Sequence, residues 1–229
     1  MRFSSLLIAT AFAATPVAAQ AVDSAFFPSS SGYQSPTGQG SYFGIGYAQG
    51  SVNEDAEVVL TEGGTDYVAT NLSENETPKG LRINWGYQGE VLGVEASLLD
   101  GGEATFTDKN PSPNGDEITG QTPVQGLEVG GFGTIPFDEG RKWQGIVGFG
   151  LAYFEGNEQW KWIGKDGSGN DQVVTLEESY ENQTPFYRVG LQFRSGSGSF
   201  SLDHRVYLRA VGTDEREFTM TGLNLNYHY

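Results

Sequence analysis

The chain has 229 residues and a formal net charge of −16, which argues against nucleic acids and anionic surfaces as partners. It contains no cysteine, and this excludes disulfides, zinc–thiolate sites and thiol catalysis together. Thirty-three glycines and a 13% share of aromatic residues favour strands and turns over helices, so we expect an all-β protein.

The first residues have the layout of a secretory signal peptide. Met1-Arg2 supplies a positive start, residues 6–14 are apolar, and either Val17-Ala18-Ala19 or Ala19-Gln20-Ala21 offers a small-residue cleavage site. The apolar stretch is too short to span a bilayer, so we expect residues 1–21 to be removed on export. Residues 22–39 are rich in Ser, Gly and Pro, which predicts a flexible periplasmic lead-in.

Period-two alternation of apolar and polar residues recurs eight times in residues 40–229. We expect strands at about 41–48, 81–87, 92–98, 127–135, 143–153, 187–194, 200–210 and 218–229. Tight turns and long loops alternate between them, with turns at 88–90, 138–142 and 195–199 and loops at about 53–79, 100–123, 155–183 and 211–217. Short turns at one end and long extracellular loops at the other are typical of a barrel in the bacterial outer membrane.

Each strand has one apolar face. Whether that face points into the barrel or out of it decides the class of protein. In the second strand Leu81 and Ile83 share one face, while Arg82 and Asn84 share the other. An inward apolar face would give a soluble lipocalin-like barrel, and an outward one a membrane barrel. Aromatic residues gather beside the short turns and the C-terminus, which favours a lipid interface: Trp85, Tyr87, Phe137, Trp143, Phe193, Phe200, Tyr227 and Tyr229.

The expected inner face carries charged residues of both signs. These are Arg82, Glu95, Glu128, Arg188, Arg194, Asp203, Arg205 and Arg209. An eight-stranded barrel is only wide enough to be filled by side chains, and Arg–carboxylate pairs suit such an interior. The sequence therefore predicts an eight-stranded antiparallel up-and-down transmembrane β-barrel with a lumen charge network.

The signal-peptide layout, the eight strands and the terminal strand Thr221–Tyr229 resemble the opacity-type, OmpA-like porin family of small outer-membrane proteins. The resemblance implies contact with outer-membrane lipid and lipopolysaccharide. It also implies that the short turns and both mature termini are periplasmic. The pair Tyr227 and Tyr229 resembles the aromatic signal that such families present to the barrel-assembly machinery. Gly222 stands two places earlier than the glycine of that signal.

Residues 166–177 match part of a calcium-binding loop. Asp166, Ser168, Asn170 and Glu177 would place oxygen ligands at loop positions 1, 3, 5 and 12. The glycine required at position 6 is Asp171 instead, and no helices flank the segment. A β-hairpin tip is the alternative, and the pattern favours it.

His204 lies on the expected lipid face between Leu202 and Val206. A lipid-A-modifying enzyme would need a nucleophile and an orienting acid on that face, but Ser201 and Asp203 point inward in this register. We expect no catalytic residue and no cofactor.

The predicted function is that of a non-enzymatic outer-membrane surface barrel, serving in loop display, adhesion or envelope integrity. A small-solute porin-like channel is the alternative, which the narrow width opposes. A lipid-A-modifying enzyme is the third possibility. Carboxylates crowd the long loops, so the exterior would attract divalent cations or a basic surface partner.

Overall fold

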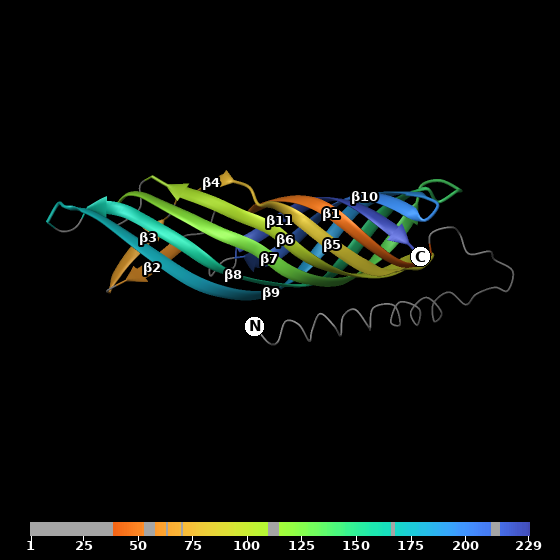
Figure 1. The fold of residues 1–229 in the computed structure, drawn as a ribbon, viewed down its shortest axis with the longest axis horizontal. Coiled ribbons are helices and arrows are strands. Elements are labelled where there is room, and N and C mark those ends of the chain that lie inside the picture. The colour runs from red at the N-terminus through yellow and green to blue at the C-terminus, as the bar shows by residue number, and fades with distance from the viewer. Residues whose placement is uncertain are drawn as a thin grey trace.

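The computed structural model describes residues 39–52, 58–62, 64–69, 71–109, 115–165, 168–211 and 216–229 (Figure 1). The expected signal peptide and residues 22–38 of the expected lead-in lie outside the described residues. Among those described, no helix is long and apolar enough to cross a membrane.

Antiparallel strands form a closed ring. The strands are β1 Gly40–Val52, β2 Val58–Glu62, β3 Thr65–Ala69, β4 Ser73–Glu76, β5 Lys79–Gln88, β6 Leu92–Asp108, β7 Gly115–Pro136, β8 Trp143–Lys165, β9 Asp171–Ser195, β10 Gly198–Val211 and β11 Arg216–His228. Eight of these strands form the ring: neighbours along the chain pair from β5 through to β11, and β1 closes the ring between β11 and β5. Within the described residues β4 pairs only with β6, and β2 and β3 form a separate two-stranded sheet. The expected eight-stranded antiparallel barrel is confirmed.

Tight turns join the strands at one end of the barrel. In the β7–β8 turn, Asp138 accepts hydrogen bonds from the backbone N–H groups of Trp143 at 2.7 Å and Lys142 at 3.2 Å. These donors hold the pKa of Asp138 below its usual value. Arg141 pairs with Glu90 of the β5–β6 turn at 2.8 Å. The turns therefore brace one another as well as reversing the chain.

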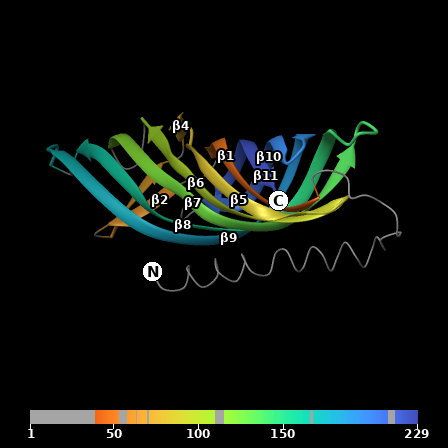
Figure 2. The same ribbon diagram turned by 45° about the vertical axis from the view of Figure 1, so that its right-hand side comes forward.

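At the opposite end, much of what the sequence predicted to be loop is strand. The predicted loop at 100–123 contains the ends of β6 and β7, and the one at 155–183 contains the ends of β8 and β9. The predicted loop at 53–79 contains β2, β3 and β4. We call β4 together with residues 103–108, 115–123, 155–165 and 171–183 the extension. Figures 1 and 2 show it projecting beyond the barrel as a curved sheet.

The apolar residues change sides along the barrel axis. Near the short turns β8 exposes Val147, Phe149 and Leu151, at 47%, 77% and 67% of their surface. In the extension, the apolar side chains of the same strand include Trp160 and Trp162, which are buried. Side chains alternate in direction along a strand, so the odd-numbered residues of β8 face outward and the even-numbered ones inward. The apolar residues occupy the odd positions near the short turns and the even positions in the extension.

A bulge in β6 changes which residues of that strand face inward. The pairing of β6 with β7 shifts register between Asp100 and Glu103, and Gly102 between them has φ 71°. Before the shift the odd-numbered Leu99 is buried, and after it the even-numbered Phe106 is buried. An extra residue in one strand reverses the facing of everything that follows, which is the effect of a β-bulge.

The exposed apolar zone, here called the membrane belt, encircles the barrel on the short-turn side of the extension. It includes Phe43, Ile45, Leu81, Ile83, Val129, Val147, Phe149, Leu151, Val189, Leu191, Leu202, Leu223 and Leu225. Soluble monomers rarely expose contiguous apolar patches of this kind, whereas a lipid bilayer requires them.

An apolar core fills the extension and continues into the barrel as one cluster. Phe106, Ile118, Trp160 and Trp162 are buried there. The β2–β3 hairpin contributes Tyr67, whose ring lies 5.0 Å from that of Trp162. The extension therefore encloses its apolar side chains as a water-soluble sheet does, while the belt exposes them.

Candidate functional site

The middle of the lumen holds a network of buried charges. Arg188 contacts Glu95 at 2.6 Å, Nη1 to Oε1, and Arg205 Nη2 contacts the same oxygen at 2.7 Å. Arg205 also pairs with Asp203 at 2.9 Å and with Glu128. Four strands, β6, β7, β9 and β10, supply these groups, and each residue faces inward as the alternation of its strand predicts.

Arg82 completes the network from β5. Its two terminal nitrogens lie 3.5 Å from Glu128 Oε1 and 3.4 Å from Asp203 Oδ1. Three arginines and three carboxylates therefore share the network, which we call the lumen network: Arg82, Arg188, Arg205, Glu95, Glu128 and Asp203. All six are at most 8% exposed. Their formal charges cancel, as the burial of charge requires.

Tyrosines and phenylalanines enclose the lumen network. Tyr42 donates to Glu95 at 2.6 Å, and the Tyr207 hydroxyl donates to Glu128. The guanidinium of Arg188 lies 4.4 Å from the ring centroid of Phe132. Sequence reasoning missed both tyrosines, although Tyr207 shares the inward register of Arg205.

The lumen network leaves almost no space. A cavity of about 10 Å³ lies among Glu95, Glu128, Arg188 and Arg205. That volume holds about one water molecule. Within the described part of the lumen, the charged layer therefore acts as a plug.

The lumen is layered on both sides of this plug. Toward the short turns lies an amide-rich layer, in which Gln88 donates to Gln144 and Gln192 at 3.3 Å each. Toward the extension lies an aromatic layer in which Phe154, Tyr207 and Phe218 pack within 6.1 Å of one another, ring to ring. A polar solute would meet both a charged plug and an apolar layer.

Arg194 and Arg209 are not part of the lumen network as described. Arg194 lies in the amide-rich layer, where it donates to Gln88 Oε1 at 3.0 Å. The side chain of Arg209 lies outside the described residues. Arg194 was expected in the network because alternation predicts which face of the strand a residue lies on. It does not predict the residue's position along the barrel axis.

A serine and a histidine meet in the amide-rich layer. Ser199 Oγ lies 2.9 Å from His228 Nε2, and Arg194 lies 3.4 Å from His228 Nδ1. In a catalytic triad an acid stands beside the second ring nitrogen of the histidine and orients it. Here the cation Arg194 stands in that place, so the pair lacks the orienting acid that would activate the serine.

His204 faces outward, as its register predicted. Its Nδ1 lies 3.0 Å from the Thr221 hydroxyl. The residues beside it on the same face are apolar: Leu202 is exposed and Val206 half-buried. Asp203 points into the lumen network instead, which separates the nearest acid from this histidine.

The structure does not bring the expected calcium ligands together. Asp166 lies outside the described residues, and Ser168 and Asn170 lie in the turn between β8 and β9. Glu177 is paired with Gln159 in the β8–β9 ladder, six residues along β9 from Asp171. At about 3.3 Å per residue this is roughly 20 Å from the turn. No cluster of three or more potential metal-binding side chains occurs among the described residues.

The terminal aromatic residues lie on the outer surface of β11. Tyr227 is exposed within the strand and Tyr229 follows its last residue. Recognition of these residues by the assembly machinery remains a prediction.

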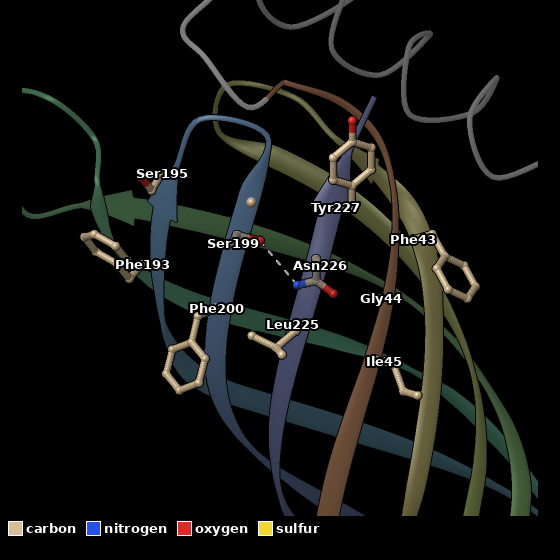
Figure 3. A pocket seen from close by; sticks show the side chains of 11 residues that line it. Phe43, Gly44, Ile45, Phe193, Ser195, Ser199, Phe200, Leu225, Asn226 and Tyr227 are labelled. Atoms are coloured by element: carbon tan, nitrogen blue, oxygen red, sulfur yellow. Dashed lines mark hydrogen bonds between the residues drawn. The ribbon is translucent and has the colours of Figure 1, made fainter.

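The outer surface near the short turns carries an apolar groove of about 440 Å³ (Figure 3). Its walls are side chains of β1, β10 and β11, including Phe43, Phe200 and Leu225. The groove lies within the membrane belt, so in a bilayer it faces acyl chains.

Gly222 allows β11 to pass close to the lumen network. A β-carbon there would lie 2.7 Å from Arg82 Nη1 and 3.0 Å from Asp203 Oδ1. We expect Gly222→Ala to lower the free energy of unfolding by about 1–3 kcal/mol, because ion-paired neighbours must move. Urea titration of the refolded barrel in liposomes measures this.

The matched control is Gly131→Ala, where the nearest atom to an added β-carbon is 3.8 Å away. This variant should differ from the parent by less than about 0.5 kcal/mol. A Gly222→Ala variant as stable as the control would show that Arg82 and Asp203 can move away from the added methyl group without loss of stability.

No protein-family model and no curated protein matches the chain. Among solved structures it is similar to Ail, the attachment invasion locus protein of Yersinia pestis. The two share 16% identity over 84% of this chain and 99% of that one, with a TM-score of 0.47. It is also similar to Neisserial surface protein A, at 13% identity over 82% and 97% of the two chains and a TM-score of 0.43. The outer membrane protein OprG from Pseudomonas aeruginosa matches at 11% identity over 86% and 100%, with a TM-score of 0.46.

Proposed function

We propose that the chain is a non-enzymatic surface protein of a bacterial outer membrane. The membrane belt anchors it in lipid and lipopolysaccharide, and the extension is displayed outside the cell for adhesion, contact or envelope integrity. Short turns are periplasmic in barrels of this kind, so both mature termini are placed in the periplasm. Tyr227 and Tyr229 would then meet the assembly machinery from that side.

One observation carries this proposal. The lumen network closes the barrel at the level of the belt, while β8 and β9 continue for 23 and 25 residues in all. A channel needs an open lumen, but here the described interior is filled with ion pairs and rings. The structured surface lies beyond the membrane, where a partner can reach it.

A porin-like channel is the second candidate function. The lumen network argues against it, because it fills the barrel interior. The lipid-A-modifying enzyme stays third. Its two candidate histidines are His204, with apolar neighbours, and His228, which has Arg194 in the place of an orienting acid. Neither places a base beside a nucleophile and an orienting acid.

Topology and conductance together test the proposal. An epitope tag inserted in the β8–β9 turn at Gly169 should be labelled on intact cells. The same tag at Gly140 in the β7–β8 turn should be labelled only after permeabilisation. The refolded protein should give no conductance steps in planar bilayers.

Labelling of the Gly140 tag on intact cells would reverse the orientation and overturn the display proposal. Regular conductance steps from the unmodified protein would make the channel the better assignment.

A further inference from the structure

One edge of the extension lacks a neighbouring strand. β9 pairs with β8 along its whole length, from Lys165↔Asp171 to Trp143↔Phe193. Its pairing with β10 reaches only from Ser195 to Phe186. Within the described residues, no strand pairs with the other side of 171–183. Pro185 stands where the pairing with β10 ends, and it has no N–H to donate.

This free edge presents backbone groups to solvent. In an antiparallel strand, alternate residues direct both N–H and C=O to the same side, so every second residue of 171–183 points away from β8. The edge is roughly 43 Å long at about 3.3 Å per residue. An edge of this length with no neighbouring strand among the described residues is a template for strand addition.

The other edge of the extension does not match it. β4 has four residues, and its pairing with β6 shifts register between Glu74 and Glu76. Short and irregular edges resist strand addition. The β9 edge is therefore the surface that invites it.

The side chains of the free edge have one sign of charge. Residues 171–183 include Asp171, Glu177, Glu178 and Glu181 and contain no lysine or arginine. All four carboxylates are exposed. Glu177 and Glu181 share the outward face, whereas Val174 is buried on the inward face. A strand added here would meet Glu177 and Glu181 on its outward face, and the half-buried Leu176 beside the exposed Glu178 on its inward face.

We propose that the free edge of β9 binds an extended basic segment of a partner protein by strand addition. Lysines or arginines on one face of that segment pair with Glu177 and Glu181, and apolar residues on its other face cover the half-buried Leu176. A second copy of this chain fits poorly, because it would bring four carboxylates against four. The inference rests on the proposed function, since the extension must be outside the cell to meet such a partner.

The experiment uses the full barrel in lipid nanodiscs, where both ends are accessible whatever the orientation in cells. The probe is a fluorescent nine-residue peptide that alternates lysine with valine, followed by anisotropy. Two versions carry N-methyl groups on alternate amides, one on the lysines and one on the valines. Only one of these sets faces the edge, so one methylated peptide should bind at least about tenfold more weakly than the other.

Charge is tested by Glu177→Gln/Glu181→Gln, which should weaken binding by about fivefold or more at low salt. The matched control is Asp116→Asn/Glu117→Gln on β7, which removes two carboxylates of the extension away from the edge and should leave binding unchanged. Equal binding of the two methylated peptides would overturn strand addition. Equal binding of the two charge variants would overturn the assignment to this edge.

The tag-labelling experiment fails or succeeds independently of this one. Peptide binding to nanodiscs together with a Gly169 tag that is silent on intact cells would reject the display proposal and keep the edge as a binding surface.

Discussion

Replacement of Glu128 by alanine is expected to lower the free energy of unfolding by about 3–5 kcal/mol. Glu128 accepts from Arg82, Arg205 and Tyr207, and all four side chains are buried. Its removal leaves three arginines facing two carboxylates inside the barrel. An uncompensated charge that cannot reach water accounts for the large effect.

The double variant Glu128→Ala/Arg205→Ala should lose less stability than the sum of the two single variants. It leaves two arginines and two carboxylates, so the charge of the lumen network remains balanced. A double-mutant cycle by urea titration in liposomes measures the coupling, expected at about 1–3 kcal/mol. Additive losses would mean that the two groups do not act as a pair.

Replacement of Val189 by arginine should cost about 2–4 kcal/mol, because a charge in the membrane belt must leave water for hydrocarbon. The same change at Val173 supplies the control. Both valines lie on β9 with similar exposure, at 49% and 56%, but Val173 belongs to the extension. Val173→Arg should therefore change the stability little.

Urea titration in liposomes and heat-modifiability on gels report the folded fraction for both variants. Equal losses at Val189 and Val173 would place the two residues in the same environment. That result would contradict the boundary between belt and extension.

The strands of the belt were predictable because lipid and lumen impose opposite polarity on alternate residues. In β9 the exposed Val189 and Leu191 alternate with Arg188 and Gln192, and this pattern gave both the strand and its facing. The charged residues of the lumen network were predictable for the same reason. Their partners were not, because pairing depends on the register among strands distant in sequence.

The extension was mistaken for loops because its alternation runs in the opposite phase and is weaker. Its outward residues are Thr, Gln, Glu and Lys, as at Gln159 and Lys161, and its inward residues are Trp160 and Trp162. In β8 the pattern of outward apolar residues ends at Leu151, because the next large apolar residue of alternating phase, Phe154, faces inward. The inversion itself is a sequence signal, since it occurs where lipid ends and water begins.

Six of the predicted lumen charges lie together in the structure, whereas the candidate calcium ligands do not, and the difference has a physical reason. Arg82 and Asp203 are 121 residues apart in sequence, yet a closed ring of known width leaves inward charges few places to go. The calcium motif assumed a compact loop between helices. The extended backbone of β9 places Glu177 far from the turn. The number and spacing of oxygen ligands in the sequence do not show this distance.

The unbroken passage of β8 and β9 from the belt into the extension has a mechanical consequence. A pull on the β8–β9 turn away from the barrel runs along the strand axes, so the ladder hydrogen bonds between β9 and β10 lie across the load. Such bonds are sheared together and do not open one after another. A tether held at this tip would therefore transmit tension into the bilayer-embedded wall, with no hinge between the point of attachment and the anchor.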